Sequence, residues 1–531
     1  MTNLRVIGHW ISKTAIVPAI AFAMSISTPV PASAEGTVVW GLPVGVSVLD
    51  PHVSCGWMAK FVDYQIFEGL VEIDLTRTEA PTQFKGQLAE SWDISEDGLV
   101  YTFNLRQGVT FHDGTPFNAD VVKFNFDRFL NPESPQYSET ANGYFAFAGI
   151  VPLIKAVDVI DEATVQITLN EPNNQFLRLG MEDCPQLYMM SPTAIMEYGE
   201  DELPLHPVGT GPFMFVSRQP GVSIELERYD GYWGEPAGPD RIIFRELEDP
   251  ATRMNAFYAG EINIIQDPTW DELENLEDEG YTVTKNEDAP ALWYMSLNMK
   301  NPQLADPRVR QAINFAINRE GLVAELMHGY GRPAYTMLNA GTFAHDRDYV
   351  SYPYDPDKAR ALLKEAGAEN LTLVFELPKY GLGELVEKWI QRDLAEVGIE
   401  VELVAMEWLA YLDKWNAGMP PEVAFTDMIW GMQTPEWTSI TYRCNSQPPN
   451  GWNNSWACNP EVDELLMKAV QTQDLDEAAR LYQEADRLMM EDPAYAPLYH
   501  YANPIALHPS VKGFVNAPAN WWDLSTITIE D

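Results

Sequence analysis

The sequence predicts an α/β protein that is built as two lobes. Three observations support this prediction: strand patterns dominate the first half of the chain, helices alternate with strands after about residue 300, and no Gly/Ser-rich linker separates the halves. With 531 residues the chain is long for one domain, so two or three domains are expected. Because no linker is present, short crossings between two lobes fit better than domains on a tether.

The first half carries strands with one buried face. In residues 100–106, Tyr101, Phe103 and Leu105 alternate with polar residues, and the turn signal EDG at 96–98 precedes them. This period of two is typical of a strand that turns one face to a core.

Helices in the second half begin at Asp-Pro pairs. Asp is a favoured N-cap residue and Pro suits the first helical position, so residues 306–307 and 355–356 each predict a helix start. Gly367 ends the second of these helices. The next elements are a strand at 371–377, a helix near 385–395 and a strand at 399–404. Such a βαβ unit predicts part of a parallel sheet.

Residues 1–34 predict a secretion signal that is removed after residue 34. They contain Arg5 and Lys13 but no acid, an apolar run at 14–26, and a final Ala-Ser-Ala. The apolar run is too short to span a membrane comfortably. The sequence therefore predicts an exported protein that lies outside the cytoplasm without membrane insertion.

The chain is strongly acidic, with 78 Asp and Glu against 34 Lys and Arg and a net charge of −44. Such a surface repels nucleic acid and anionic membranes, so neither is an expected partner. Two interpretations stay open: a solvated acidic surface, or an attraction for a cationic ligand.

Four cysteines suit an oxidising compartment. Cys444 and Cys458 lie 14 residues apart in a loop rich in Asn, Pro and Trp, and we expect a disulfide between them. The spacing does not decide whether Cys55 and Cys184 pair. The absence of a C-x-x-C motif argues against zinc and thioredoxin-like chemistry.

No motif for catalysis or for a cofactor is present. The sequence lacks H-E-x-x-H, G-x-S-x-G, a P-loop and a G-x-G-x-x-G after a strand. His112 and Asp113 in the tetrapeptide FHDG fit a turn better than half a metal site. We therefore expect no catalytic residue, no metal and no cofactor, although a pair of catalytic carboxylates cannot be singled out or dismissed in so acidic a chain.

Residues 88–120, LAESWDISEDGLVYTFNLRQGVTFHDGTPFNAD, closely resemble the signature of the family 5 extracellular solute-binding proteins, the receptors of ABC importers for dipeptides, oligopeptides and nickel complexes. One departure is that Asp120 stands alone where the family often has two acids. Seven further segments agree in order: FEGLV at 67–71, VGTGPF at 208–213, ERYDGYWG at 227–234, RMNAFYAGEINI at 253–264, DPRVRQAINFAINRE at 306–320, DPDKARALLKEAG at 355–367 and NPEVDELL at 459–466.

The resemblance implies a periplasmic binding protein fold of type II, cluster C-like, with a hinge and a ligand cleft between two lobes. We expect residues 35–288 and 503–531 in the first lobe and 295–497 in the second. The hinge crossings are expected near 289–297 and 498–502. The implied function is the capture of a peptide or peptide-like solute and its delivery to the permease subunits of an ABC importer, by a monomer that closes around the solute.

The resemblance also points to the ligand-facing residues. Peptide-binding members carry an aspartate shortly after the Trp of the WG segment, and here Gln433 stands there. An arginine grips the carboxylate of dipeptides, and here Lys379 and Tyr380 stand in that loop. The predicted ligand-binding residues are Ser54, Cys55, Gly56, Trp57, Tyr144, Phe145, Lys379, Tyr380, Trp430, Gly431, Met432 and Gln433.

The residues at both positions that bind the charged ends of a peptide in relatives differ in this chain. Two other kinds of ligand therefore stay possible within the same fold: an oligosaccharide or an opine. Trp57, Trp430 and Trp437 are candidates to stack on the solute, although any of them could equally pack a core. For Trp452 and Trp456, inside the expected disulfide loop, core packing is the preferred interpretation. A secreted hydrolase that uses carboxylates is the remote alternative from another class.

Overall fold

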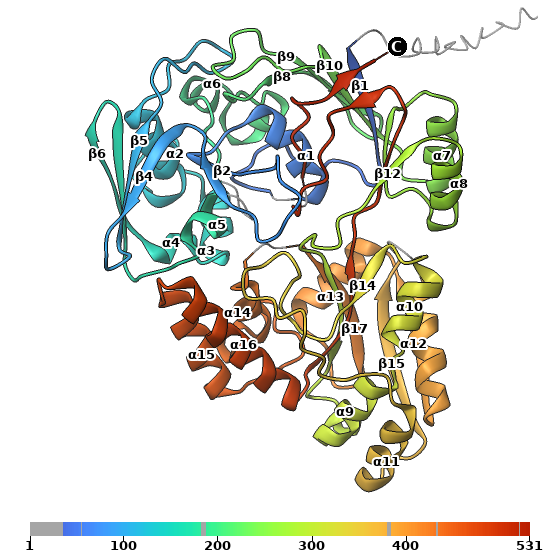
Figure 1. Ribbon diagram of the computed structural model, residues 1–531. Helices are drawn as coiled ribbons and strands as arrows, with labels where there is room; N and C mark the ends of the chain where they lie inside the picture. Colours follow the sequence, from blue (N-terminus) through green and yellow to red (C-terminus); the bar gives the residue numbers. More distant parts are fainter. Residues whose placement is uncertain are drawn as a thin grey trace, which may run out of the picture. The chain divides into compact units, whose positions relative to one another are not determined.

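The computed structural model describes residues 36–54, 56–181, 187–379, 384–431, 434–519 and 521–530. Within them, the strands form three sheets of four or more strands, and Figure 1 shows helices covering these sheets. The seven-stranded and four-stranded sheets build the first lobe, and the six-stranded sheet builds the second. The predicted two-lobe α/β fold is confirmed.

The seven-stranded sheet joins segments from both ends of the chain. Its order is β12-β19-β11-β1-β10-β9-β8. Strand β1 pairs in parallel with β10 and β11, whereas β19 lies antiparallel between β11 and β12. The strands are β1 (Thr37–Leu42), β8 (Phe213–Gln219), β9 (Ser223–Arg228), β10 (Arg241–Glu246), β11 (Ile264–Gln266), β12 (Thr282–Thr284) and β19 (Ile505–Leu507).

The four-stranded sheet is antiparallel, in the order β4-β5-β7-β6. It consists of β4 (Ala89–Ile94), β5 (Val100–Leu105), β6 (Ile154–Asp161) and β7 (Thr164–Leu169). In β5 the alternating residues Tyr101, Phe103 and Leu105 are buried, as their spacing predicts. Two small ribbons complete the strands: β2 (Val71–Ile73) with β3 (Phe84–Gly86), and β20 (Val511–Lys512) with β21 (Thr528–Ile529).

Side-chain caps define several helix starts in the first lobe. The side chains of Asn118, Ser138 and Asp249 accept hydrogen bonds from backbone amides in the first turns of α2, α3 and α7. The helices are α1 (Trp57–Ile66), α2 (Ala119–Leu130), α3 (Glu139–Phe147), α4 (Ile150–Leu153), α5 (Phe176–Met181), α6 (Pro192–Glu202), α7 (Pro250–Tyr258) and α8 (Leu273–Asp278).

Two glycines of the VGTGPF segment allow α1 to approach the chain before β8. A Cβ at Gly209 would lie 2.0 Å from the carbonyl oxygen of Ile66, and one at Gly211 would lie 2.7 Å from that of Gln65. Any side chain at these positions would push the end of α1 away, so the close packing requires glycine at both.

The second lobe is built on a mixed sheet of order β14-β18-β13-β17-β15-β16. Strand β15 pairs in parallel with β16 on one side and with β17 on the other. Helix α12 connects β15 to β16, as the predicted βαβ unit requires. The strands are β13 (Leu292–Leu297), β14 (Gly331–Pro333), β15 (Leu371–Pro378), β16 (Ile399–Met406), β17 (Phe425–Trp430) and β18 (Tyr495–Tyr501).

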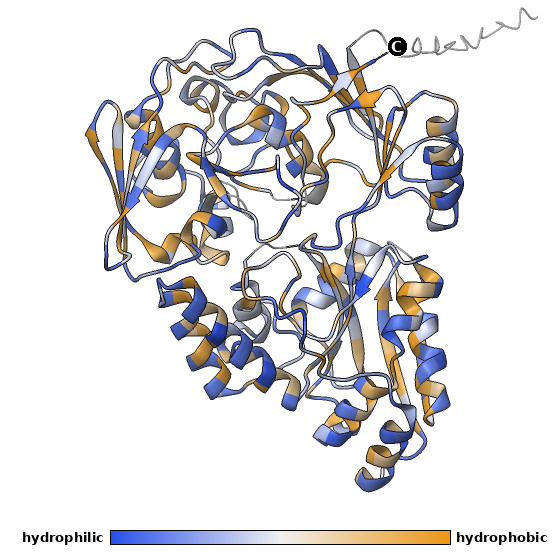
Figure 2. Ribbon diagram, in the orientation of Figure 1, coloured by the Kyte–Doolittle hydropathy of each residue, from blue (hydrophilic) through white to orange (hydrophobic). Residues whose placement is uncertain are grey.

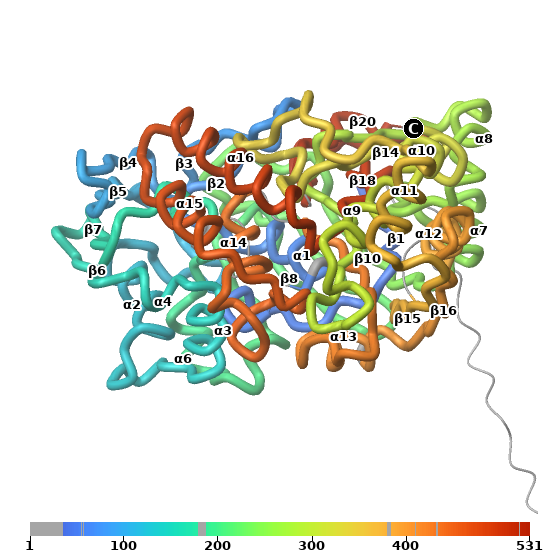
Figure 3. The backbone as a smooth tube through the Cα atoms, turned by 90° about the horizontal axis from the view of Figure 1, so that it is seen from below, coloured from blue at the N-terminus to red at the C-terminus, as the bar shows by residue number. Residues whose placement is uncertain are grey.

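The helices of the second lobe confirm both Asp-Pro starts, with Asp306 and Asp355 as N-caps, and Gly367 adopts φ 65° at the end of α11. Helices α15 and α16 pack side by side (Figure 3), and each carries an apolar and a polar side (Figure 2). The helices are α9 (Pro307–Ala316), α10 (Arg319–Leu326), α11 (Pro356–Ala366), α12 (Leu385–Glu396), α13 (Trp408–Ala417), α14 (Trp437–Tyr442), α15 (Pro460–Gln471) and α16 (Leu475–Glu491).

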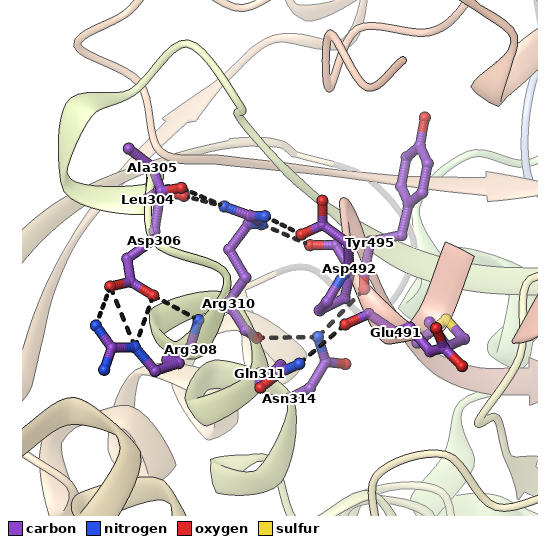
Figure 4. Close-up of polar contacts among 12 residues, drawn as sticks. Leu304, Ala305, Asp306, Arg308, Arg310, Gln311, Asn314, Glu491, Asp492 and Tyr495 are labelled. Carbon is purple, nitrogen blue, oxygen red and sulfur yellow. Dashed lines mark hydrogen bonds and ion pairs between the residues drawn. The ribbon is translucent and has the colours of Figure 1, made fainter. Parts of the chain in front are cut away.

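Arg310 ties the start of α9 to the turn between α16 and β18 (Figure 4). Its Nε donates to the carbonyl oxygen of Pro493 at 3.0 Å, its Nη1 donates to that of Ala305 at 3.1 Å, and Nη2 pairs with Asp492. Asn314, one turn later, donates to the carbonyl oxygen of Tyr495 at 3.2 Å. These bonds satisfy carbonyl groups that the chain reversal leaves without partners.

The chain passes from the seven-stranded to the six-stranded sheet after β12 and returns after β18. The lobe limits and hinge crossings stated above stay a prediction. The predicted disulfide between Cys444 and Cys458 is confirmed. Among the described residues, none of the helices combines the length and apolar content needed to cross a membrane.

Candidate functional site

Three parallel strands of the second lobe end at one edge of their sheet. The register pairs Pro378 at the end of β15 with Met406 at the end of β16, and β17 runs parallel to both and ends at Trp430. Ligands of open α/β sheets bind outside the carboxyl ends of parallel strands. This edge is therefore the candidate site on the second lobe.

Lys379 and Glu407 follow two of these strands and bind each other. Lys379 Nζ lies 2.8 Å from Glu407 Oε1, and both side chains are exposed. The hydrogen bond and the attraction of Glu407 raise the pKa of Lys379. As observed, the ammonium of Lys379 is partly neutralised, so it is a weaker grip for a carboxylate than a free arginine.

Trp430 is fixed at the end of β17. Its Nε1 donates a hydrogen bond of 2.8 Å to the hydroxyl of Tyr294, and its ring stacks on Trp452 with centroids 4.3 Å apart. Trp430 and Gly431 are both partly exposed. Because its ring nitrogen and one ring face are engaged, Trp430 is held in one orientation and presents a rigid aromatic surface.

Trp452 extends this surface and brings in the first lobe. The ring centroid of Trp415, in α13, lies 6.1 Å from that of Trp430 and 6.4 Å from that of Trp452. The ring centroid of Phe147, in α3, lies 4.9 Å from that of Trp452. Trp452 lies in the loop that the Cys444–Cys458 disulfide closes. The sequence predicted only packing for Trp452. The contact with Phe147 had no signal in the sequence, since it joins residues 305 positions apart.

Two further tryptophans singled out from the sequence, Trp437 and Trp456, are structural. Trp437 is fully buried in the core of the second lobe. Trp456 donates from Nε1 to the carbonyl oxygen of Met419 at 2.9 Å, and its ring lies under the ammonium of Lys300. Packing is thus the observed role of Trp437, and for Trp456 it is the role that the sequence predicted.

On the first lobe, Ser54 and Gly56 form the turn that leads into α1. Ser54 Oγ accepts from the amide of Gly56 at 3.3 Å and lies 3.4 Å from Ser47 Oγ. Gly56 is the N-cap of α1, and no side chain caps this helix. Trp57 begins α1. Contact of these residues with a ligand stays a prediction.

Helix α3 turns different aromatic residues outward and inward. Tyr144 is partly exposed, whereas Phe145 has no exposed surface and stacks on Phe129 with centroids 4.0 Å apart. Phe147 is the exposed ring. The observed role of Phe145 is therefore packing of the first-lobe core, and its predicted contact with a ligand has no support here. Cys55, Cys184, Tyr380, Met432 and Gln433 lie outside the described residues.

A buried pair of carboxyl groups lies behind the strand edge. Glu387, in the first turn of α12, and Asp427 of β17 interact electrostatically and are both about 1% exposed. Trp293 Nε1 donates to Asp427 Oδ2 at 2.9 Å, and Tyr499 stacks on Trp293. Burial raises the pKa of both carboxyls, and repulsion by Asp427 raises that of Glu387 further. The pair therefore holds one proton at neutral pH.

We expect Glu387→Gln to raise the free energy of unfolding by about 1–3 kcal/mol at pH 8 and to change it little at pH 5. The pKa of Glu387 is about 10 in the folded state and about 4.5 in the unfolded state. Between these values the folded state holds a proton on Glu387 that the unfolded state releases, so the wild-type protein loses stability as the pH rises above about 4.5. The amide cannot ionise, so the variant does not carry this pH-dependent loss of stability. Urea unfolding at both pH values measures the change.

Glu384→Gln is the matched control for this variant. Glu384 precedes the same helix but is partly exposed and paired with Lys388 at 2.8 Å. We expect changes within about 0.5 kcal/mol at both pH values. An equal effect of Glu387→Gln at pH 5 and pH 8 would show that the pair does not hold the proton.

The described residues contain no group of three or more His, Cys, Asp or Glu that could hold a metal ion. His112 Nε2 hydrogen-bonds to the carbonyl oxygen of Gly211 at 2.9 Å, and the amide of Gly114 donates to Phe111, so FHDG forms the predicted turn. A cavity of about 370 Å³ lies elsewhere in the second lobe. It is lined by α9, α11, the end of α16 and residues 349–352, and it includes none of the predicted ligand-binding residues.

Two lobes on separate sheets, a chain that crosses twice between them, and an aromatic surface at the parallel strand ends define a solute-binding protein of the two-lobe type. The chain belongs to the bacterial extracellular solute-binding proteins, family 5, whose middle-region model matches residues 83–450. The resemblance stated from the sequence is confirmed.

Several relatives are similar over nearly their whole length. The glutathione-binding protein GsiB of Salmonella typhi is 31% identical over 495 residues, which cover 90% of this chain and 92% of GsiB. The periplasmic binding protein DppA of Helicobacter pylori, solved with the peptide STSA, is 28% identical with a TM-score of 0.80, covering 94% of this chain and 98% of DppA. AgaA of Agrobacterium tumefaciens, solved with agropinic acid, is 25% identical with a TM-score of 0.76, covering 93% and 99%.

Proposed function

We propose that this protein is a periplasmic receptor that captures a short peptide or peptide-like solute and delivers it to the permease of an ABC importer, without catalysing a reaction. The similarity to a glutathione-binding protein along nine-tenths of the chain carries the proposal. The similarity to DppA, solved with a peptide, supports the same class of solute. Residues 1–34 have the pattern of a cleaved secretion signal, which supports the periplasm.

The solute would bind between the lobes against the aromatic surface of Trp430 and Trp452. Hydrogen bonds to the peptide backbone supply much of the affinity in strand-like binding. A peptide ligand therefore does not require both an acidic residue for its α-ammonium and an arginine for its carboxylate. On the first lobe, Ser54, Cys55, Gly56, Trp57 and Tyr144 are the proposed contacts. On the second lobe they are Lys379, Tyr380, Trp430, Gly431, Met432 and Gln433. The proposed lobe limits are 35–288 with 503–531, and 295–497, with hinges near 289–297 and 498–502.

An opine is the second candidate solute. AgaA, with agropinic acid, is 25% identical to this chain, and Lys379 is already paired with Glu407. An opine-like solute would use the aromatic surface and hydroxyl groups in place of an α-ammonium grip. An oligosaccharide would use the same features.

A thermal unfolding screen separates these candidates. Glutathione, dipeptides, tripeptides, agropinate and maltooligosaccharides are each added at 1 mM. We expect stabilisation by a peptide or glutathione, equal to about 4 kcal/mol when the concentration is 1,000 times the Kd. Trp430→Ala should weaken this binding at least about tenfold, whereas Trp92→Ala, in the four-stranded sheet, should not. Stabilisation by agropinate alone would select the opine, and turnover of any added compound would contradict the receptor class.

A further inference from the structure

Residues 171–175 of the first lobe contact the second lobe through several hydrogen bonds. This segment, called the latch here, has the sequence EPNNQ and lies between β7 and α5. It is fixed on its own lobe because the hydroxyl of Tyr101 donates to the carbonyl oxygen of Asn173 at 3.0 Å, and the Asn173 side chain accepts from the amide of Gln175 at 2.8 Å. The latch thus presents Asn174 in one orientation.

Asn174 caps the last turn of α15, a helix of the other lobe. Its backbone amide donates to the carbonyl oxygen of Val470 at 2.8 Å, and its Nδ2 donates to those of Ala469 at 2.9 Å and Thr472 at 2.5 Å. The last carbonyls of a helix have no partner within it, and Thr472 is not a glycine that could close the helix by a left-handed turn. The amide of Thr472 donates to the carbonyl oxygen of Ala469 at 3.2 Å, so Asn174 adds a second donor to Ala469 and supplies a donor to Val470 and to Thr472 from across the lobe boundary.

A second bond of the latch reaches the ligand-facing segment. Thr434, which directly follows residues 430–433, donates from Oγ1 to Gln175 Oε1 at 3.2 Å, and Gln175 Nε2 donates to Asn174 Oδ1 at 2.7 Å. Thr434 is fully buried and Gln175 nearly so. A continuous chain of hydrogen bonds therefore runs from the end of the ligand-facing segment, through Gln175 and Asn174, to the end of α15.

We propose that Asn174 and Gln175 are positioning residues that hold the two lobes closed and tie closure to the place of the ligand-facing segment. The contact of Phe147 with Trp452 crosses between the lobes nearby, but it is apolar and lacks direction, so the latch supplies the geometric selectivity. When the lobes open, Asn174 loses its hydrogen bonds to all three carbonyl oxygens together, so a partly opened state keeps none of them. A displaced ligand-facing segment would lose Thr434 as donor and weaken the closed state.

Asn174→Asp tests the proposal with a side chain of the same shape. The carboxylate cannot donate to Ala469 and Thr472, and its negative charge faces the negative end of the α15 dipole. Asn170→Asp is the matched control, because Asn170 lies just before the latch and its bonds, to Pro152 and Leu153, stay within the first lobe. Small-angle X-ray scattering of the purified proteins, without and with 1 mM glutathione, measures closure.

We expect a larger radius of gyration for Asn174→Asp than for wild type and Asn170→Asp in at least one of these conditions. Glutathione release should be at least about tenfold faster, with association within about threefold and the melting temperature without solute unchanged within about 2 °C. Equal radii for all three proteins in both conditions would overturn the proposal. The scattering comparison without solute does not depend on glutathione, so a failure of glutathione to bind would count against the proposed function while leaving that latch result intact.

Discussion

Replacing Arg128 with Met is expected to lower the free energy of unfolding by about 3–5 kcal/mol at pH 7. Arg128 Nη1 and Nη2 donate to Asp50 Oδ1 and Oδ2 at 3.0 and 2.6 Å, and both side chains are withdrawn from solvent. Without the guanidinium, Asp50 would be a buried charge without its counterion. The charge of Asp50 also acts on Asp63, because burial and repulsion by Asp50 raise the pKa of Asp63.

The pH dependence of this loss has a definite sign. Burial opposes ionisation of Asp50, but the attraction and hydrogen bonds of Arg128 hold its pKa below the ordinary value. The stability from the pair is therefore present above the unfolded pKa of about 4 and is lost as the pH falls through the folded value. In the variant, Asp50 takes up a proton at mildly acidic pH, so the deficit should shrink between pH 7 and pH 4.5. Urea unfolding at both pH values measures it.

Arg480→Met is the control, because Arg480 pairs with Glu477 on the exposed face of α16. We expect a change within about 0.5 kcal/mol. The double variant D50L/R128M, which removes both charges, should recover part of the loss. A deficit of less than about 1 kcal/mol in Arg128→Met would mean that water or another group compensates Asp50.

Removing the disulfide should have the next largest effect. We expect the double variant C444S/C458S to lose about 3 kcal/mol, the chain-entropy value for a loop of roughly 15 residues. The disulfide closes the loop that holds Trp452 on Trp430, so the variant should also weaken solute binding. Urea unfolding and calorimetric titration measure the two effects.

Asn450→Ser, an exposed residue of the same loop, is the matched control. Its unfolding free energy should stay within about 0.5 kcal/mol of wild type. Substitution is a cleaner test than a reducing agent, since it changes only Cys444 and Cys458. A cysteine-free loop that unfolds at the same urea concentration as wild type would show that its contacts alone hold it in place.

Local patterns made much of the fold predictable. The Asp-Pro starts of α9 and α11 and the βαβ unit of β15, α12 and β16 follow from caps and periods that act within a few residues. The order of the seven-stranded sheet could not be predicted, because β19 is inserted between strands more than 200 residues earlier in the chain. No local signal specifies such a pairing.

The candidate site was predictable in part. The choice of Trp430 as a candidate residue came from the resemblance, whereas β17, which ends at Trp430, was not predicted from the sequence. Which aromatic residue of α3 faces outward does not follow from the sequence, since Phe145 and Phe147 lie two residues apart on a short helix with a weak pattern. The pairing of Glu387 with Asp427, and the bonds of Asn174, join residues 40 or more positions apart. The identities of these residues do not indicate which partners they contact, so these contacts are known only from the structure.

The position of β19 also bears on how the molecule is made. The second sheet is complete by residue 501, whereas the seven-stranded sheet needs residues 505–507 to fill the gap between β11 and β12. The seven-stranded sheet, which contains β1 from the start of the described chain, is therefore completed only by a strand close to its end. A chain cut before residue 505 would keep an intact six-stranded sheet and expose two unpaired strand edges, which are sites for aggregation with other nascent copies.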